Sequence, residues 1–149
     1  MLNRLKDVFA SLQNHEVRYL VIGGIAAVLY GVPRATFDLD ILIEASPENA
    51  RNLLAALREA GLATAEMISD EELLRHEITV FKDKVRIDVQ TRTPGIDFLE
   101  AWQAKAEMHY HGQVLFVVSR QDLIASKAAA GREIDKEDVR VLQAFHQNG

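Results

Sequence analysis

The chain has 149 residues, 48% of them hydrophobic, which is enough to bury the core of a single domain spanning residues 1–149. It contains no cysteine, which excludes disulfides, thiolate zinc sites and a cysteine nucleophile. The formal net charge is −5 and no run of Lys or Arg occurs, so the sequence lacks the basic footprint of a dedicated nucleic-acid-binding protein.

The sequence predicts neither a membrane span nor a secretion signal. No stretch approaches the roughly 18 consecutive apolar residues that cross a bilayer. Residues 1–7 lack the apolar segment of a signal peptide. We therefore expect a cytoplasmic protein with no membrane partner.

The first predicted elements are a helix over residues 2–14, a strand over residues 18–22 and a short helix over residues 25–30. Gly23 and Gly24 join the strand to the short helix. A double glycine at such a turn lets the backbone approach a ligand closely, and the helix start offers N–H groups to a phosphate. A purely structural turn accounts for the same pair. The chain has no Walker motif and no G-x-G-x-x-G dinucleotide motif.

A strand over residues 37–43 carries two acidic residues on one face. Because successive side chains of a strand point to opposite faces, Leu39 and Ile41 face a core, whereas Asp38 and Asp40 project together. Their Cα atoms are expected about 6.6 Å apart. Only this acid-x-acid pair lies in a strand, where aspartate is depleted and buried charge is costly. We interpret the other three pairs as solvated helix faces: Asp70/Glu72, Glu133/Asp135 and Asp135/Glu137.

An amphipathic helix is predicted to follow, ending near residue 60. Ser46 is its expected N-cap, Pro47 occupies its first position and Gly61 closes it. No element is predicted for residues 63–75. Beyond them, two β-rich runs flank the polar turn at residues 82–84, which predicts a hairpin over residues 79–90.

The second strand of this hairpin carries a third acidic residue, Asp88, on the face opposite Ile87 and Val89. Taken alone, Asp88 fits a strand with one wet face. Together with Asp38 and Asp40, it predicts three carboxylates that repel one another unless cations neutralise them. Mg²⁺ is usually held by one or two carboxylates plus substrate phosphates, so the cluster indicates a phosphate-handling site.

The C-terminal third is predicted to hold a loop at residues 94–95, strands over 107–111 and 114–118, and two helices. His109 and His111 alternate on the first of these strands. Without acids or cysteines at ligand spacing, a surface strand is favoured over a metal site.

The first C-terminal helix is predicted from its ends. Ser119 and Asp122 form a capping box at its start, and Gly131 caps its end. The spacing of three apolar residues gives the last helix a buried face: Val139, Leu142 and Phe145.

The order of these motifs resembles the polymerase-β-type nucleotidyltransferase superfamily. Its pattern of a Gly-Gly strand end, a short helix, an Asp-x-Asp strand and a later single-Asp strand is matched by Gly23-Gly24, Asp38-Leu39-Asp40 and Asp88. The longer pattern Gly-Gly-x-Ala-x(4)-Gly-x-x-Arg-x-Thr-x-Asp-x-Asp is similar to small bacterial stand-alone members of the abortive-infection and toxin-antitoxin type. The further matching residues are Ala26, Gly31, Arg34 and Thr36. The resemblance implies an α/β (α+β) fold with a mixed, mostly antiparallel sheet flanked by helices, and with C-terminal helices.

The resemblance extends to the C-terminus, where Asp122-Leu-Ile-x-x-Lys127 precedes Asp135-x-x-Asp138. It implies that Lys127 faces nucleotide phosphates. From the residues alone, a solvated lysine is the commoner interpretation of Lys127, and Asp135 and Asp138 are equally first-turn acids of the last helix. Five basic residues are candidates to gather around the site, in positions that the sequence does not fix: Arg34, Arg86, Arg92, Lys127 and Arg132.

The resemblance also implies a metal-dependent enzyme that transfers a nucleoside monophosphate from an NTP, such as ATP, to an acceptor. Asp38, Asp40 and Asp88 would be the catalytic residues and would coordinate two Mg²⁺ ions. The implied nucleotide-binding residues are Gly23, Gly24, Arg34, Thr36 and Lys127.

Two matters stay open at this stage. Relatives modify RNA, proteins or small molecules, so the acceptor is undetermined, as is the NTP. The alternative function is a non-catalytic protein that binds a nucleotide or a cognate partner protein, as in a toxin-antitoxin pair. The intact set of three carboxylates favours the enzyme.

Overall fold

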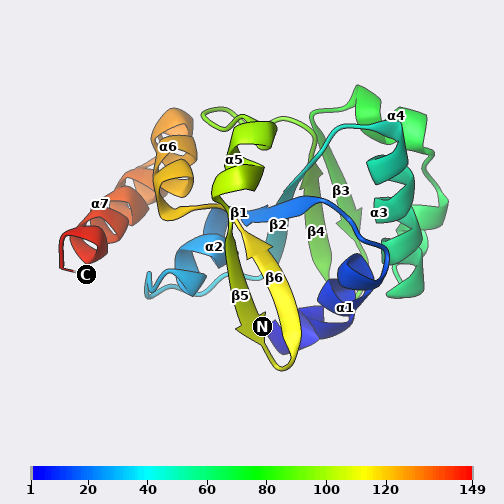
Figure 1. Cartoon of the computed structure of the whole chain (residues 1–149), viewed down its shortest axis with the longest axis horizontal. Helices are drawn as coiled ribbons and strands as arrows, with labels where there is room; N and C mark the ends of the chain where they lie inside the picture. Colours follow the sequence, from blue (N-terminus) through cyan, green and yellow to red (C-terminus); the bar gives the residue numbers. More distant parts are fainter. Residues whose placement is uncertain (1, 149) are drawn as a thin grey trace.

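A six-stranded sheet with the strand order β3-β4-β2-β1-β6-β5 forms the centre of the molecule (Figure 1). The computed structural model describes the backbone of residues 2–148 and the side chains of residues 4–144. The strands are β1 (Tyr19–Ile22), β2 (Asp38–Ile43), β3 (Ile78–Lys82), β4 (Arg86–Gln90), β5 (Ala106–Tyr110) and β6 (Gln113–Val117). Three of the five strand pairings are antiparallel, whereas β1 pairs with β6 and β2 with β4 in parallel. The predicted mixed, mostly antiparallel sheet of an α/β fold is confirmed.

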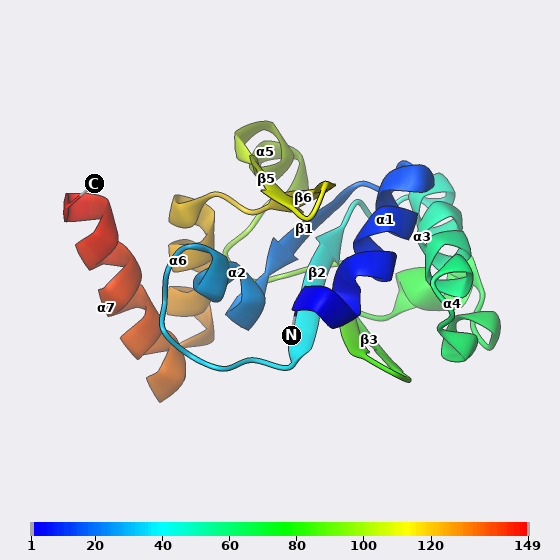
Figure 2. The same cartoon turned by 90° about the horizontal axis from the view of Figure 1, so that it is seen from below.

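The helices lie on two sides of this sheet (Figures 1 and 2). On one side are α1 (Lys6–Asn14), which extends the 3-10 turn η1 (Leu2–Leu5), then α3 (Pro47–Glu59) and α4 (Asp70–Arg75), which follows the 3-10 turn η2 (Ala63–Glu66). On the other side are α2 (Gly23–Leu29), α6 (Arg120–Ala130) and α7 (Glu133–Asn148). The remaining helix, α5 (Phe98–Ala104), lies beside β5 and β6.

The core forms where the apolar faces of β2 and β4 meet the helices of the first side. Leu39 and Ile41 of β2 and Ile87 and Val89 of β4 are completely buried, as their alternation along the strands predicts. The acidic residues of the same strands therefore face the opposite side of the sheet. Burial of the apolar face fixes the strand register, because a shift by one residue would move the acids into the core.

The predicted helix ends have the expected caps. Ser46 Oγ accepts a hydrogen bond from Asn49 N at the start of α3, and Ser119 Oγ accepts one from Asp122 N at the start of α6. Gly131 follows α6 with a left-handed backbone, φ 68°, which glycine adopts without steric cost.

Two helices were not predicted. Ser69 caps α4 and accepts from Glu72 N, and Asp97 caps α5 and accepts from Glu100 N. In both segments the capping Ser or Asp is followed three residues later by Glu, which is the pattern of a helix start. Their lengths of six and seven residues are too short for apolar periodicity to reveal them.

The last helix is confirmed over Glu133–Asn148, and Leu142 is buried while Val139 is half-buried. The side chain of Phe145, the third residue of the predicted buried face, lies outside the described residues. His109 and His111 are both exposed at the β5–β6 hairpin, as predicted. Across residues 2–148, no helix has the length and apolar character needed to cross a membrane.

Candidate active site

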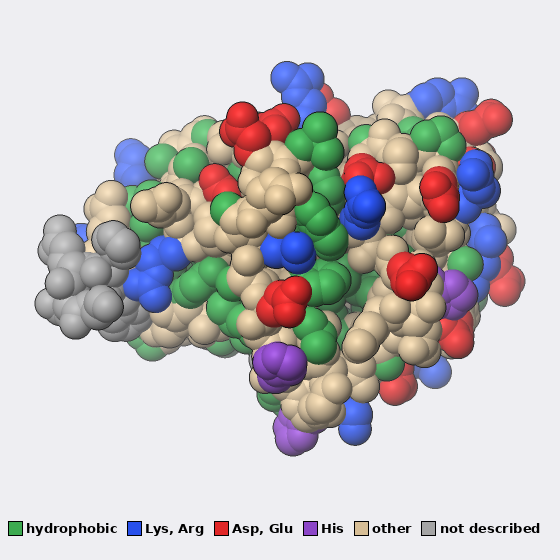
Figure 3. All heavy atoms as spheres, viewed as in Figure 1, with side chains coloured by type: hydrophobic (Ala, Val, Ile, Leu, Met, Phe, Trp, Pro, Cys, Tyr) green, Lys and Arg blue, Asp and Glu red, His purple; other side chains and the backbone are tan. Residues whose placement is uncertain are grey.

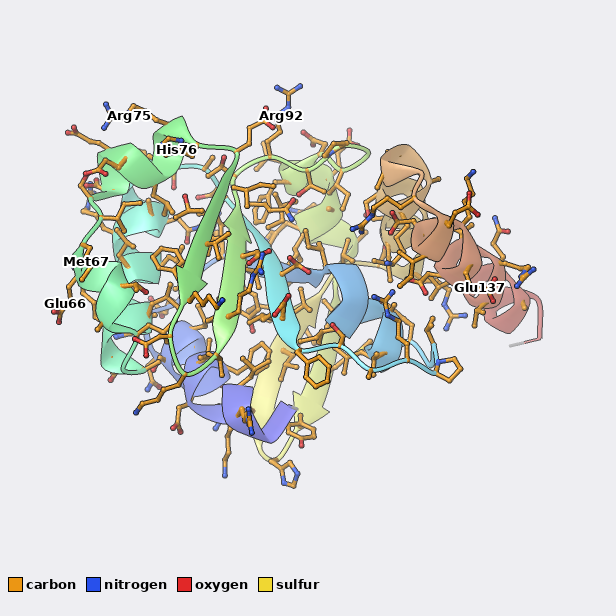
Figure 4. The ribbon with its side chains drawn as sticks, turned by 180° about the vertical axis from the view of Figure 1, so that it is seen from behind. Glu66, Met67, Arg75, His76, Arg92 and Glu137 are labelled. Atoms are coloured by element: carbon orange, nitrogen blue, oxygen red, sulfur yellow. The ribbon has the colours of Figure 1, made fainter. Side chains whose placement is uncertain are left out.

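The three predicted carboxylates come together on the side of the sheet that carries α2 and α6. Strands β2 and β4 run parallel with Asp40 opposite Asp88 and Asp38 opposite Arg86. Residues directly opposite each other on neighbouring strands project on the same face. Asp38, Asp40 and Asp88 therefore line one hollow of about 460 Å³, and Figure 4 shows β2 and β4 from behind, with α2 and α6 beside them.

The surroundings of Asp40 in the carboxylate cluster disfavour its charged form. Burial and the neighbouring charges of Asp88 and Asp38 raise the pKa of Asp40 from 3.8 to about 7, and a hydrogen bond with Asp88 adds to this. The positive charge of Arg86 acts in the opposite direction and is the weaker influence. An added cation would relieve this repulsion.

Arg86 is the cation that the structure places at the cluster. Its Nε and Nη2 atoms donate to the two carboxylate oxygens of Asp88 at 3.0 and 3.3 Å, and Nε lies 3.8 Å from Asp38 Oδ2. The hydrogen bond and charge of Asp88 raise the pKa of Arg86. The sequence indicated Arg86 as a candidate cation but gave no signal for this partner.

The donor set fits a magnesium ion, since all three residues offer carboxylate oxygens, the ligand type that Mg²⁺ prefers. Arg86 supplies one positive charge beside three carboxylates, so it does not neutralise the cluster. Among residues 4–144, however, no three acidic or histidine side chains are arranged to hold a metal ion as they stand. Arg86 contacts two of the three carboxylates, so a cation that binds all three requires its guanidinium to move.

The double glycine lies beside Asp40 and Thr36. Gly23 has φ +70°, and a Cβ atom there would lie only 2.5 Å from Asp40 Oδ2. A Cβ atom at Gly24 would lie 2.8 Å from Thr36 Oγ1 and 3.5 Å from an Arg34 guanidinium nitrogen. Both glycines therefore make room for side chains of the protein itself, which adds a structural reason for the pair to the ligand contact that the sequence suggested.

A buried ion-pair network forms the wall of the hollow opposite β4. Lys127 is 5% exposed, and its Nζ donates to Asp138 Oδ2 at 2.7 Å and lies 3.6 Å from Asp135 Oδ1. Arg34 Nη1 donates to the same Asp138 oxygen at 2.5 Å. Arg132 Nε donates to Asp135 Oδ2 at 2.7 Å. The network ties α6, α7 and the segment before β2 together.

This network corrects two interpretations from the sequence. Asp135 is not part of a solvated helix face but 1% exposed, and Asp138 is 2% exposed. Burial alone would raise the pKa of Asp135, but the hydrogen bonds and charge of Arg132, with the charge of Lys127, outweigh it and hold that pKa below its usual value. Lys127 is not a solvated lysine either. The acids are buried because each has a basic partner across the α6–α7 contact, which spacing within one helix does not reveal.

Most of the predicted residues surround the hollow, and one does not. Arg92 is directed away from it and is 80% exposed, 3.8 Å from Glu77 (Figure 4). The predicted residues that line it are Gly23, Gly24, Arg34, Thr36, Asp38, Asp40, Arg86, Asp88, Lys127 and Arg132. Lining residues that the sequence did not indicate are Ile22, Gln90, Thr93, Pro94, Ser126 and Ala130, whereas Asp135, which also lines it, belongs to the C-terminal motif of the resemblance. In addition, Arg34 Nε is buried without a hydrogen-bond partner among the described residues.

A second hollow, of about 560 Å³, lies between α1, α3 and α5. Its polar side chains already bond to one another: Arg18 pairs with Glu44 at 2.9 Å, and Asn49 bonds to the backbone of both residues. The molecular face that carries α5 and the β5–β6 hairpin mixes acidic and basic side chains without a continuous basic area (Figure 3). This hollow shows no cluster of groups comparable to the carboxylates.

Comparisons with known proteins concern the family and the fold of the chain. The family model described as "Nucleotidyltransferase of unknown function (DUF6036)" matches residues 2–146. No curated protein matches the sequence.

Two solved structures show a similar fold. The lincosamide antibiotic adenylyltransferase LnuA, solved with lincomycin bound, has a TM-score of 0.62 and 16% identity, with 97% of this chain and 98% of that chain covered. TM1012 of Thermotoga maritima, described as a candidate nucleotidyltransferase, has a TM-score of 0.54 and 18% identity, with 99% and 93% covered. At these identities the likeness shows the fold alone.

Proposed function

The chain belongs to the DUF6036 family of nucleotidyltransferases, and we propose that it transfers a nucleoside monophosphate from an NTP to an acceptor in a Mg²⁺-dependent reaction. The observation that carries this proposal is the register of β2 and β4, which sets Asp40 opposite Asp88 with Asp38 in the same hollow. Carboxylates on adjacent strands are a recurrent way to hold the cations that accompany a triphosphate.

Asp38, Asp40 and Asp88 would hold the magnesium ions, two in the proposed reaction, once Arg86 releases Asp88. Bound Mg²⁺ would neutralise charge on the reacting phosphate and would activate the attacking oxygen. Asp88, on the β4 side of the cluster, would accept the proton of the acceptor hydroxyl at its carboxylate. The ions would hold Asp40 in its charged form, because a nearby positive charge lowers the pKa that burial and the charges of Asp88 and Asp38 raise.

The triphosphate would lie on the opposite side of the cluster, over the glycine turn. Gly24 would donate its backbone N–H, Thr36 its hydroxyl, and Arg34 and Lys127 their positive charge. Gly23 would keep the turn close to Asp40. The buried Nε of Arg34, which lacks a protein partner, is an additional donor at this wall.

The charge balance explains why metal would be required. The hollow and the network behind it bring five carboxylates together with four cations, which leaves no positive excess for a triphosphate. The acids are Asp38, Asp40, Asp88, Asp135 and Asp138, and the cations are Arg34, Arg86, Lys127 and Arg132. Nucleotide binding is therefore expected only with a divalent ion.

The test has two stages. Thermal unfolding with Mg²⁺, with each NTP and with both measures binding, because a ligand of the native state raises the melting temperature. Incubation with each α-labelled NTP and a cell lysate then measures transfer onto RNA, proteins or small molecules. Stabilisation by Mg²⁺ and NTP without transfer would instead support the non-catalytic alternative, in which the fold binds a nucleotide or a partner protein.

A further inference from the structure

A basic hollow of about 310 Å³ adjoins the carboxylate site at the turn of the β3–β4 hairpin. It is lined by Arg4 from η1, Phe37, Lys82, Lys84 and Arg86, with Asp83 as its acidic member. Arg86 borders both this hollow and the carboxylate hollow, so the two are neighbours that share its side chain.

Three of these cations are free to meet a ligand. In the described part of the chain, no carboxylate lies within ion-pair distance of Arg4, Lys82 or Lys84, whereas Arg86 is paired with Asp88. Asp83 is engaged with backbone instead, since its two oxygens accept from Ala63 N at 3.0 Å and Lys84 N at 2.9 Å. The lining of the hollow therefore carries a local excess of positive charge, although the net charge of the chain is −5.

Phe37 is the second independent feature of this surface. It lies between Thr36 and Asp38 and is 78% exposed, although a phenylalanine ring is favoured in a core. It lines the basic hollow together with Arg86 and directly precedes Asp38 in the chain. An exposed aromatic ring beside unpaired cations is the combination that binds single-stranded nucleic acid, whose bases stack while its phosphates meet the cations.

The glycine turn and the basic hollow lie on opposite sides of the cluster. The glycine turn and Lys127 are on the β1 side of β2, whereas Lys82 and Arg86 are on the β4 and β3 side. In an in-line displacement, the attacking oxygen approaches opposite the leaving pyrophosphate. A triphosphate over the glycine turn therefore leaves the basic hollow as the approach for the acceptor.

We propose that the acceptor is a single-stranded polynucleotide, which binds along Arg4, Lys82, Lys84 and Phe37 and presents its 3′ hydroxyl at Asp88; this rests on the proposed function. The 3′ oxygen forms a bond to the α-phosphorus of the NTP, and the bond from that phosphorus to the bridging oxygen of the β-phosphate breaks. Pyrophosphate leaves, and the hydroxyl proton passes to Asp88 and then to solvent. The strand is lengthened by one nucleotide.

The test measures, by fluorescence anisotropy and without NTP, how tightly the protein binds a fluorescein-labelled single strand of 12 nucleotides. An RNA strand and a DNA strand are measured separately. Lys82→Ala/Lys84→Ala should weaken binding at least five-fold. It should also make the plot of log K against log salt shallower by about 1.4, since each phosphate contact of a single strand contributes about 0.7. Phe37→Ala should weaken binding about ten-fold with little change in that slope.

The matched control is Arg75→Ala/Arg92→Ala, which removes the same two charges from exposed positions at the far end of β3 and β4 (Figure 4). This control should bind the strand as the wild type does. Equal weakening in the control and test variants, or no binding by the wild type, would overturn the proposal. If the wild type binds no strand but transfers label to a protein or small molecule, the acceptor inference fails while the proposed function stands. Binding of the strand at these residues without nucleotide transfer would overturn the proposed function and with it the acceptor role, and would leave only a strand-binding surface.

Discussion

Lys127 Nζ lies 2.7 Å from Asp138 Oδ2, and the two side chains are only 5% and 3% exposed. The same ammonium group lies 3.6 Å from the buried carboxylate of Asp135. Removal of one partner of a buried ion pair costs about 3–5 kcal/mol. Lys127→Ala should lower the free energy of unfolding by about 3 kcal/mol, the low end of this range, because each carboxylate keeps an arginine. Urea denaturation measures this loss.

The control for this prediction is Lys136→Ala on the exposed side of α7, where Lys136 is 65% exposed and pairs with Glu133. Its loss should stay below about 1 kcal/mol. At a temperature where both variants are folded, Lys127→Ala should also bind Mg²⁺ and NTP more weakly by about 1.5–3 kcal/mol by calorimetric titration. Unchanged nucleotide affinity would limit Lys127 to a structural role.

Gly23→Ala should damage both stability and the carboxylate site. A left-handed backbone costs a non-glycine residue about 1–2 kcal/mol, and the added Cβ would also lie 2.5 Å from Asp40 Oδ2. Gly112→Ala is the matched control, because Gly112 has φ +79° with nothing within 4 Å of the added atom. We expect a larger loss of stability for Gly23→Ala, and loss of stabilisation by Mg²⁺ in that variant only. Equal behaviour of the two variants would show that Asp40 moves aside freely.

The stability of the metal-free protein should fall as the pH rises from about 4 to 7. Asp40 has its pKa raised from 3.8 to about 7 in the folded chain, so within this window the native state binds more protons than the unfolded state, and deprotonation disfavours folding. The loss should be on the order of 2 kcal/mol, because Asp40 is partly exposed and water screens part of the repulsion.

Asp40→Asn isolates this contribution. The difference in unfolding free energy between Asp40→Asn and the wild type should increase with pH across the window, and the variant should be at least as stable as the wild type at pH 8. It should also bind Mg²⁺ and nucleotide poorly, the trade-off expected of a charged site. Parallel urea titrations at several pH values without metal provide the comparison, and a marked loss of stability at pH 8 would mean that Asp40 is retained for folding.

Arg86→Met should increase the stabilisation gained from Mg²⁺. Arg86 holds Asp88 through two hydrogen bonds and competes with any ion there. Without metal, the variant should lose little stability, because Arg86 is 42% exposed and water screens its ion pair with Asp88. The rise in melting temperature on addition of Mg²⁺ should then exceed that of the wild type. An equal or smaller rise would show that Arg86 does not occupy the cation position.

The sequence predicted the carboxylate face well because strands have a simple period. Alternation alone set Asp38, Asp40 and Asp88 opposite the buried residues of β2 and β4, and the structure has that arrangement. The ion pairs were not predictable in the same way. Asp135 and Asp138 are buried only because α7 packs on α6 and Lys127 meets them there. Their positions near the start of a helix favoured solvated acids instead.

The glycine turn shows the same limit. The sequence indicated Gly23 and Gly24 as a close approach to a ligand, but it contained no information that Asp40 and Thr36 would occupy the space above them. Contacts between segments distant in sequence decide such details. The helices α4 and α5 were missed for a different reason, since their capping patterns were present but their length was below two turns.

The most direct test of the account is transfer of an α-labelled nucleoside monophosphate from NTP to the acceptors of a cell lysate in the presence of Mg²⁺, by the wild type and by Asp88→Asn. Asn keeps the shape of Asp88 on β4 but removes the charge that faces Asp40. We expect a labelled acceptor with the wild type, none when Mg²⁺ is chelated, and a loss of at least 100-fold with Asp88→Asn, the low end for removal of a group that acts in general acid–base catalysis. Transfer by Asp88→Asn at the wild-type rate, or by the wild type without divalent metal, would contradict the assignment of this hollow as the active site.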